Sequence, residues 1–306
     1  MASPRYRTVR SFILWRAIVV LSFFGRHLPL RTARFLGRML GRLAWQVVRR
    51  PRRDALRNLA VAFPDWTEEQ RRDVIRRMFL HFGESTFEYV WLPNLDLEMR
   101  NRTTVIEGFE PIRAYIERGR GVVVFTAHCG NWEWLANSVG LLGVPVAVLQ
   151  RERNEGELNR LITQTRALAG VRTIDRGTAS SGRELFQAIR RGGILAFLID
   201  QNIRTEMAKV PFFAILTPTP IGPAKLAIRT DAVAVSAFIE RRGDMQYIRF
   251  LDPIECHRGD DPIALTARIT RHIEAQIRRV PEQWAWMHDR WKERPEWLVG
   301  RMKDEG

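Results

Sequence analysis

The chain has 306 residues, of which 45% are hydrophobic, and this composition supplies a large buried core and argues against a disordered or fibrous protein. Its formal net charge of +15 indicates an anionic partner: a nucleic acid, an acidic membrane face or a phosphorylated substrate. The two cysteines, Cys129 and Cys256, are too few for a disulfide framework and lack zinc-type spacing. We therefore expect a reducing, intracellular setting and neither a metal nor another cofactor.

The N-terminal section differs from the rest in charge, because every charged residue from Met1 to Arg53 is an arginine. Within it, Phe12 to Phe24 is an apolar run that only Arg16 and Ser22 interrupt. As a helix the run would be roughly 20 Å long, shorter than the roughly 30 Å hydrocarbon core of a bilayer. The positive flank favours an uncleaved anchor or an in-plane membrane helix. A buried core helix is the alternative, and a signal peptide is disfavoured because no small-residue cleavage site follows.

The next segment, Arg34 to Val48, has apolar residues at helical spacing, namely Phe35, Leu36, Met39, Leu40, Leu43, Ala44 and Val47. Arg34, Arg38 and Arg42 recur every four residues beside this stripe. Two interpretations stay open. The helix packs its stripe on the core and leaves a solvated basic edge, or it lies on anionic lipid as a basic amphipathic helix.

Two further helices are predicted before any strand. The first runs from Pro51 to Phe63, where Pro64 stops it. Thr67 opens the second, with Gln70 three positions later as in a capping box, and this helix continues toward Pro93.

From Thr103 onward, short β-branched runs alternate with helical stretches. The strand candidates are Val105–Ile106, Val122–Thr126, Val144–Leu149, Val171–Ile174, Ile194–Ile199, Val233–Ile239 and Met245–Phe250. Helical patterns between several of them are Glu110–Arg118, Trp132–Leu141, Glu157–Leu168, Arg183–Arg190 and Pro223–Arg229. This alternation predicts an α/β fold with a mixed central sheet covered by helices, preceded by the N-terminal helical, membrane-associating section. We divide the chain into residues 1–50, an anchor and basic helix, and residues 51–306, the α/β domain.

The strand Val122–Thr126 leads directly to His128, and reactive groups gather where strands of an α/β sheet end. Gly130 permits a tight turn, and Asn131 can cap a helix whose first turn holds Glu133. Residues five apart on one helix do not face each other, so His128 must precede the helix. From there the Glu133 carboxylate can reach one imidazole nitrogen, as a general base requires. A histidine satisfied by a core hydrogen bond is the alternative.

The H-x-x-x-x-[D/E] pattern after a buried strand resembles the motif of glycerolipid acyltransferases and of the lipid A late acyltransferases. The segment TAHCGNWEW, with aromatic residues beside the acid, is similar to the latter group. Further blocks with this resemblance occur in order along the chain: NLAVAFPDWTEEQ at 58–70, LQRERNEGELNRLI at 149–162, LIDQN at 198–202, PFF at 211–213 and PEQWAWMHDRWKERP at 281–295.

The resemblance implies a single α/β acyltransferase domain with a membrane-embedded N-terminal helix, on the cytoplasmic face of the inner membrane. The implied donor is an acyl carrier protein thioester, with acyl-CoA as an option, and the acceptor is a hydroxyl of an anionic lipid A precursor. His128 would deprotonate this hydroxyl, which attacks the thioester directly, while Glu133 orients His128. Cys129 lies in a variable slot of the motif, so we interpret it as a packing residue.

Other positions match the family's substrate-binding blocks. Arg151 follows a predicted strand and can bind a phosphate or the developing oxyanion, and Arg153 and Asn154 are close enough to share this task. A solvated surface role is the alternative for any one of these arginines.

Asp200 ends the strand Ile194–Ile199 and matches the first acid of a D-Q-D block, in which Asn202 departs from the pattern. Asp200 can hold an arginine or the acceptor, or it can simply cap the strand. Thr217 and Thr219 match a threonine-rich block whose hydroxyls can bind a headgroup, although the adjoining prolines also suit an ordinary turn. The tryptophans of the last block and beyond suit a membrane interface or core packing: Trp284, Trp286, Trp291 and Trp297.

Two rival functions remain. A nucleic-acid-binding protein explains the charge and the interspersed aromatic residues, but no zinc finger, RNP-type run or helix-turn-helix pattern is present, and we expect no nucleic acid partner. An acyltransferase for another glycolipid or a phospholipid keeps the fold and changes the acceptor. A hydrolase is disfavoured because no G-x-S-x-G elbow occurs.

Overall fold

The computed structural model describes residues 25–151, 156–178 and 180–291. The apolar run Phe12–Phe24, Arg153, Asn154 and Trp297 lie outside the described residues. The predictions made for these positions therefore stay predictions.

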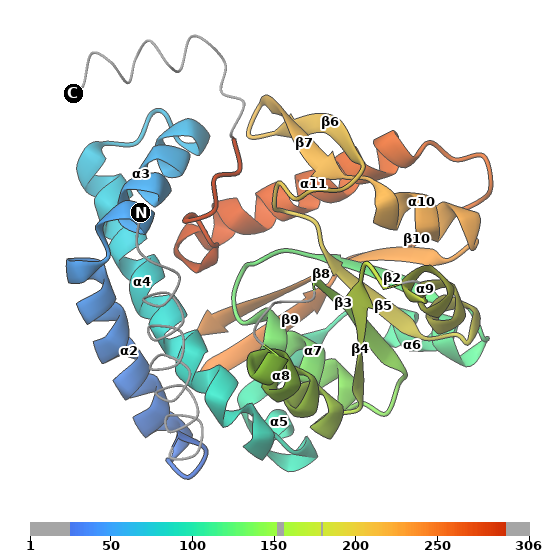
Figure 1. Cartoon of the computed structure of the whole chain (residues 1–306), viewed down its shortest axis with the longest axis horizontal. Helices are drawn as coiled ribbons and strands as arrows, with labels where there is room; N and C mark the ends of the chain where they lie inside the picture. Colours follow the sequence, from blue (N-terminus) through green and yellow to red (C-terminus); the bar gives the residue numbers. More distant parts are fainter. Residues whose placement is uncertain (1–24, 152–155, 179, 292–306) are drawn as a thin grey trace.

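The described chain is built around an eight-stranded, mostly parallel sheet in the order β1-β9-β8-β2-β5-β3-β4, with β10 paired to β8 (Figure 1). Among the described strands of this sheet, the β8–β9 and β8–β10 pairs are antiparallel and the other pairs are parallel. The seven strands that the sequence predicts are confirmed, with small shifts of their ends. The observed bounds are β1 Thr104–Glu107, β2 Val122–Thr126, β3 Val146–Arg151, β4 Val171–Arg176, β5 Ile194–Leu198, β8 Val233–Arg242, β9 Met245–Phe250 and β10 Ile254–Glu255.

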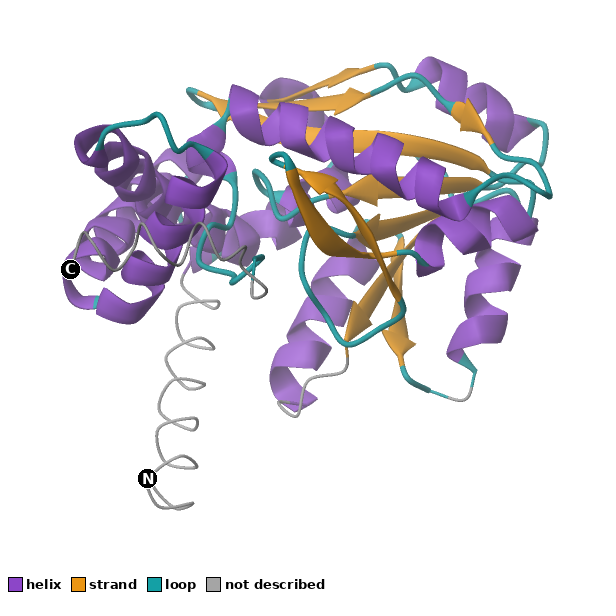
Figure 2. Cartoon of the chain, turned by 90° about the horizontal axis from the view of Figure 1, so that it is seen from above, coloured by secondary structure: helices purple, strands orange, loops and turns teal. Residues whose placement is uncertain are grey.

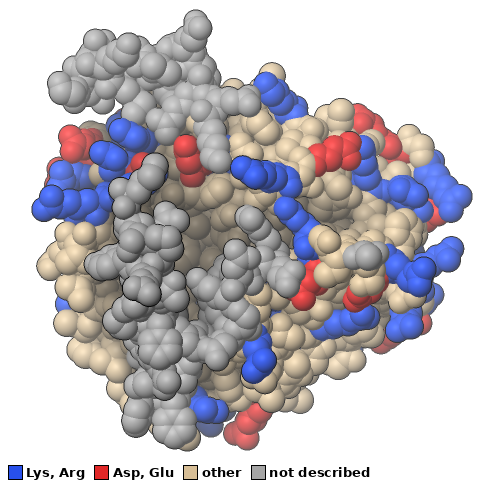
Figure 3. Space-filling view, viewed as in Figure 1, with Lys and Arg blue, Asp and Glu red and all other residues tan. Residues whose placement is uncertain are grey.

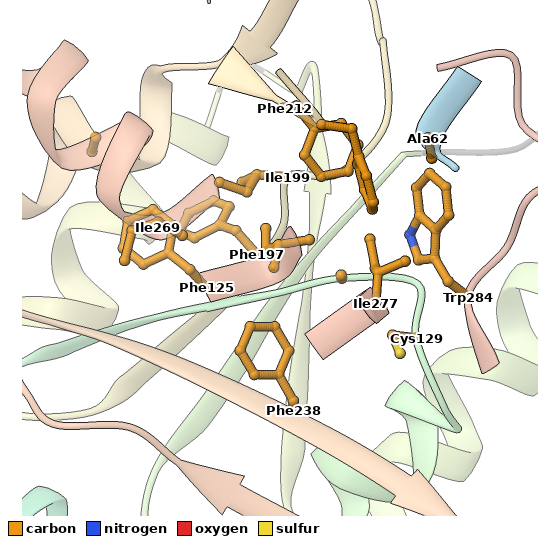
Figure 4. Packing of buried hydrophobic residues seen from close by; sticks show 14 of the residues in the cluster. Ala62, Phe125, Cys129, Phe197, Ile199, Phe212, Phe238, Ile269, Ile277 and Trp284 are labelled. Atoms are coloured by element: carbon orange, nitrogen blue, oxygen red, sulfur yellow. The ribbon is translucent and has the colours of Figure 1, made fainter. Parts of the chain in front are cut away.

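Helices cover both faces of this sheet (Figure 2). Side chains alternate across each strand, so Val123 and Phe125 of β2 belong to one buried cluster and Val122 and Val124 to another. The first cluster packs against α10 (Gly222–Arg229) and α11 (Pro262–Arg279), where Figure 4 shows Phe125 near Ile269. The second packs against α6 (Glu110–Glu117) and α7 (Trp132–Gly140). Burial on both faces explains why β2 and β5 are continuous apolar runs.

Three N-terminal helices lie beside the sheet, on the left of Figure 1: α2 (Leu30–Val47), α3 (Arg49–Ala62) and α4 (Glu68–Trp91). The predicted capping box at the start of α4 is confirmed. The Thr67 backbone N–H donates to Gln70 Oε1 at 2.8 Å, and the Gln70 N–H donates to Thr67 Oγ1 at 3.2 Å. The remaining α-helices are α5 (Leu97–Thr103), α8 (Gly156–Leu168) and α9 (Ser181–Arg190).

Helix α2 packs on α4 through its small residues and not through its apolar stripe. A Cβ at Gly37, Gly41 or Gly83 would clash with the facing backbone, so glycine permits this close approach. Apart from Ala44, which packs against the core, the stripe points outward instead, with exposed fractions of 56% for Phe35 and 63% for Val47. Packing of this stripe on the core is therefore the wrong interpretation. Within the described residues, no helix combines the length and apolar character needed to cross a bilayer.

Three strands and two helices have no counterpart in the sequence prediction. Strands β6 (Met207–Phe212) and β7 (Ile215–Pro220) form a separate two-stranded sheet, where prolines at 211, 218 and 220 disguise the strand pattern. The others are β10, α5 and the long helix α11, which begins at an Asp261 cap and carries many charged residues.

Candidate active site

His128 and Asp200 meet at the carboxyl ends of two neighbouring parallel strands. The register of β2 and β5 pairs Thr126 with Leu198, the last residues of the two strands, and His128 and Asp200 each follow two residues later. The imidazole Nδ1 lies 2.9 Å from Asp200 Oδ1, and the His128 backbone N–H donates to Asp200 Oδ2 at 2.9 Å. One carboxylate thus fixes both the main chain and the ring of the histidine.

Asp200 is buried, and a third donor, the Trp284 indole Nε1, lies 2.8 Å from its Oδ2. Burial by itself would raise the pKa of the Asp200 carboxyl, but the charge and hydrogen bonds of His128 and the indole bond lower it below the ordinary value. An ionised Asp200 accepts a hydrogen bond from Nδ1–H and leaves Nε2 of the imidazole as a proton acceptor. The His128 side chain is 24% exposed, so it can be reached from outside.

The turn between β2 and α7, residues 127–131, is called the His128 turn and is held from several directions. Gly130 has φ of +65°, and a Cβ there would clash with the backbone of β8. The Gly130 N–H donates to Gln283 O at 2.8 Å, and the Ala285 N–H donates to His128 O at 3.1 Å. Asn131 caps α7 by accepting from the Trp134 N–H at 3.1 Å, as the sequence suggests.

Glu133 has a different partner from the one that the sequence suggested. Its two oxygens accept from Arg166 of α8, at 2.6 Å from Nη2 and 2.9 Å from Nε. The expectation that the Glu133 carboxylate accepts from one imidazole nitrogen of His128 is therefore corrected: the Glu133 oxygens accept from Arg166, and Asp200 is the partner of Nδ1. The reason is geometric, because strand register brings Asp200 to the imidazole while the first turn of α7 directs Glu133 toward α8.

Arg166 is a site residue that sequence reasoning missed. Burial by itself would lower the pKa of its guanidinium, but the hydrogen bonds and charge of Glu133 raise it, so Arg166 stays charged. Its Nη1 also donates to Gln150 Oε1 at 2.8 Å. The neighbouring Arg151 ends β3, one residue after Gln150. Among so many arginines, the sequence does not single out Arg166, because its role depends on the contact between α7 and α8.

Thr217 and Thr219 lie buried on β7. The Thr217 hydroxyl donates to Ile215 O at 2.8 Å and the Thr219 hydroxyl to Thr217 O at 3.2 Å. Arg290, also buried, donates from Nη2 to Thr219 Oγ1 at 2.6 Å. These contacts support the hairpin, and binding of a headgroup by the two hydroxyls stays a prediction.

Cys129 and three tryptophans of the last block belong to the core. Figure 4 shows Cys129 near Trp284 and Ile277. Burial raises the pKa of the Cys129 thiol well above its usual value, which fits the packing role expected for it. Trp284, Trp286 and Trp291 are each at most 1% exposed, so core packing is the correct interpretation for these three.

A hollow of about 440 Å³ lies away from this site, at the amino ends of β5 and β8. Residues that line it include Arg190, Arg229 and Arg258. On the face shown in Figure 3, basic residues form separate groups that alternate with acidic and uncharged areas. Among the described residues, no group of three His, Cys, Asp or Glu side chains is placed to hold a metal ion.

Comparison with known proteins identifies the family. The family model described as bacterial lipid A biosynthesis acyltransferase matches residues 1–293. The chain belongs to this family. It is an acyltransferase, and the resemblance seen in its motifs is confirmed.

Two relatives from Escherichia coli (strain K12) align with this chain over nearly the full length of both proteins. The lipid A biosynthesis lauroyltransferase is 27% identical over 310 residues, covering 97% of this chain and 98% of the relative. The lipid A biosynthesis palmitoleoyltransferase is 28% identical over 300 residues, with 95% and 93% covered. A phosphatidylinositol mannoside acyltransferase from Mycolicibacterium smegmatis is 23% identical over 240 residues, with 77% and 78% covered. The sequence left two classes open, an enzyme and a nucleic-acid-binding protein, and membership of this family identifies the chain as an enzyme.

Proposed function

We propose that this acyltransferase moves a fatty acyl group from a thioester to a hydroxyl of a lipid A precursor, with His128 as the general base. The observation that carries the proposal is the partly exposed imidazole bound through Nδ1 to a buried, ionised Asp200. This arrangement gives Nε2 the acceptor role that a base requires. The relatives named for lauroyl and palmitoleoyl transfer in lipid A biosynthesis support the acceptor class.

The reaction proceeds by direct attack. The acceptor hydroxyl transfers its proton to Nε2 of His128 as its oxygen bonds to the thioester carbonyl carbon, which gives a tetrahedral oxyanion. Asp200 stabilises the imidazolium that forms. Collapse of the oxyanion restores the carbonyl and breaks the C–S bond, and the departing thiolate takes the proton from the imidazolium.

Glu133 keeps a catalytic role in this proposal, exercised through Arg166. Because the pair is bidentate and largely buried, Glu133 fixes the guanidinium of Arg166 beside the first turn of α7. Guanidinium N–H groups held in this way can donate to the oxyanion, together with Arg151, Arg153 and Asn154. We expect Glu133→Ala to abolish transfer in a folded protein. A folded variant with normal turnover would remove Glu133 from the mechanism.

We place the protein on the cytoplasmic face of the inner membrane, with an acyl carrier protein thioester as donor and acyl-CoA as the alternative. The outward stripe of α2 supports membrane contact, because exposed apolar side chains next to arginines suit an anionic lipid surface. The stripe comprises Phe35, Leu36, Met39, Leu40, Leu43 and Val47.

Lipid mass spectrometry of a deletion strain tests the proposed function. We expect lipid A to lack one acyl unit, and the intact gene but not a His128→Ala copy to restore it. Unchanged lipid A, with an acyl unit lost from another glycolipid or a phospholipid, would favour the second candidate. The similarity to a phosphatidylinositol mannoside acyltransferase is the observation behind that candidate.

A further inference from the structure

A buried carboxylate outside the reacting groups connects four parts of the chain. Glu88 of α4 is 0% exposed, and its oxygens accept from four side chains. The donors are Arg34 Nε of α2 at 2.7 Å, Arg241 Nη2 of β8 at 2.8 Å, Asn131 Nδ2 at 2.9 Å and Gln246 Nε2 of β9 at 3.0 Å. Of these contacts, the one to Asn131 reaches the His128 turn.

Fold stability gives a poor explanation for this cluster. Burial by itself would raise the pKa of Glu88, but Arg241 and Arg34 lower it to about 2, so the carboxylate stays ionised. Buried ion pairs cost so much desolvation that well-packed apolar residues are often as stable in their place. A fixed anion is useful, however, where it orients a donor.

Asn131 is held at both ends of its amide. Its Nδ2 donates to Glu88, while its Oδ1 accepts the Trp134 N–H at the start of α7. Asn131 stands three residues after His128 and two before Glu133, so its position sets the turn that carries both.

Arg241 adds a second tether to the same turn. Its backbone N–H donates to Gln283 Oε1 at 2.8 Å and its carbonyl accepts from Gln283 Nε2 at 2.9 Å. The Gln283 carbonyl in turn accepts the Gly130 N–H. Glu88 therefore acts on the turn through Asn131 and through Arg241.

We propose that Glu88 is the positioning residue of the His128 turn. It touches no reacting group: it fixes Asn131 and thereby the approach of His128 to Asp200. Through Arg34 it also ties this turn to α2, whose opposite side carries the exposed apolar stripe. The inference rests on the proposed function, and it predicts an effect on turnover and not on substrate affinity.

The test compares Glu88→Gln with Glu84→Gln in the full chain. Glu84 is the control for the Asn131 contact: it is buried one turn earlier on α4 and shares Arg241 with Glu88, but no hydrogen bond of the described residues joins it to Asn131. In Glu84→Gln, Arg241 keeps its two bonds to Glu88, so both tethers of the turn persist. We expect kcat of Glu88→Gln to fall at least about tenfold with KM within about twofold. Glu84→Gln should stay within about threefold of the unaltered kcat.

A swapped pair separates positioning from general stability. In the double variant Glu88→Gln with Asn131→Asp, amide and carboxylate exchange places, so the hydrogen bond and the total charge persist. We expect it to regain at least about fivefold in kcat over Glu88→Gln, because contacting sites couple. Asn131→Asp alone should be worse than the double variant, since two carboxylates then face each other. A double variant no better than either single variant would overturn the proposal.

If Glu88→Gln does not fold, Asn131→Ser decides. Serine keeps a cap for α7 but removes the donor to Glu88, so its kcat should fall about tenfold. Normal turnover of folded Asn131→Ser or Glu88→Gln, beside an active unaltered chain and an inactive His128→Ala variant, would overturn this inference alone. Absence of transfer by the unaltered chain would overturn the proposed function and this inference with it.

Discussion

The two buried carboxylates that are hydrogen-bonded to the His128 turn differ in their partners. Asp200, at the end of β5, faces an imidazole and an indole, whereas Glu88, on α4, faces two arginines and two amides. An imidazole can exchange a proton near neutral pH, but a guanidinium cannot. The first arrangement can therefore move a proton, and the second can only hold geometry. The difference teaches that burial of a carboxylate does not by itself mark a catalytic residue, since the partner decides.

The largest effect is expected at the pair of His128 and Asp200, which can move a proton. His128→Ala removes the base, so the rate of acyl transfer should fall about 10³-fold or more. General acid–base groups typically contribute about 10²–10⁴-fold to a rate. Initial rates with purified protein measure this, and circular dichroism checks the fold. Folded His128→Ala protein with near-normal turnover would end the general-base mechanism.

A smaller effect, on membrane binding, is expected from changes in α2, the helix that Glu88 holds through Arg34. The double substitution Leu40→Glu with Leu43→Glu places negative charge on the outward stripe of α2, so partition onto anionic vesicles should drop about tenfold. Leu168→Glu, at an even more exposed leucine on α8, is the control and should bind normally. Sedimentation with vesicles gives the measurement. Unchanged binding of the double variant would move the membrane contact away from α2.

The ionised Glu88 should change how the free energy of unfolding depends on pH in the acid range. The folded-state pKa of Glu88 is lowered from 4.5 to about 2, so its stabilisation is present above pH 4.5 and is lost as pH falls toward 2. Compared with the unaltered chain, Glu88→Gln should therefore show a weaker decline of unfolding free energy over this window. Urea titrations at a series of pH values give the comparison. Parallel curves for the two proteins would argue against an ionised Glu88.

The smallest effect is expected at Cys129, which lies beside His128 but only packs. Cys129→Ser should keep most activity, because the acceptor hydroxyl attacks the thioester directly. Mass spectrometry of the enzyme mixed with donor alone provides the check. An acyl group trapped on Cys129 would replace this chemistry with a covalent route.

The sequence predicts local features well and long-range partners poorly. Strand β2 has the predicted bounds, because a strand buried on both faces is a continuous apolar run. Asp200 was placed correctly at a strand end. Its contact with His128 depends on β2 and β5 being neighbours, and no local pattern encodes that order.

The helical region shows the same limit. The stripe of α2 has helical periodicity, as predicted, yet periodicity says nothing about which side faces the core. Gly37 and Gly41 decide this, since they allow the backbones of α2 and α4 to approach closely. Arg166 was missed for a related reason: its role depends on Glu133, thirty-three residues away in the chain.

The most direct test of the account is the turnover of Asp200→Asn. The amide keeps the size of the side chain but loses the charge that stabilises the imidazolium, so kcat should fall about 10²-fold or more while the protein stays folded. Single-turnover rates measured beside Glu133→Gln complete the comparison. A folded Asp200→Asn protein with near-normal kcat would contradict the account and, with Glu133→Gln inactive as expected, would return the role of orienting His128 to Glu133.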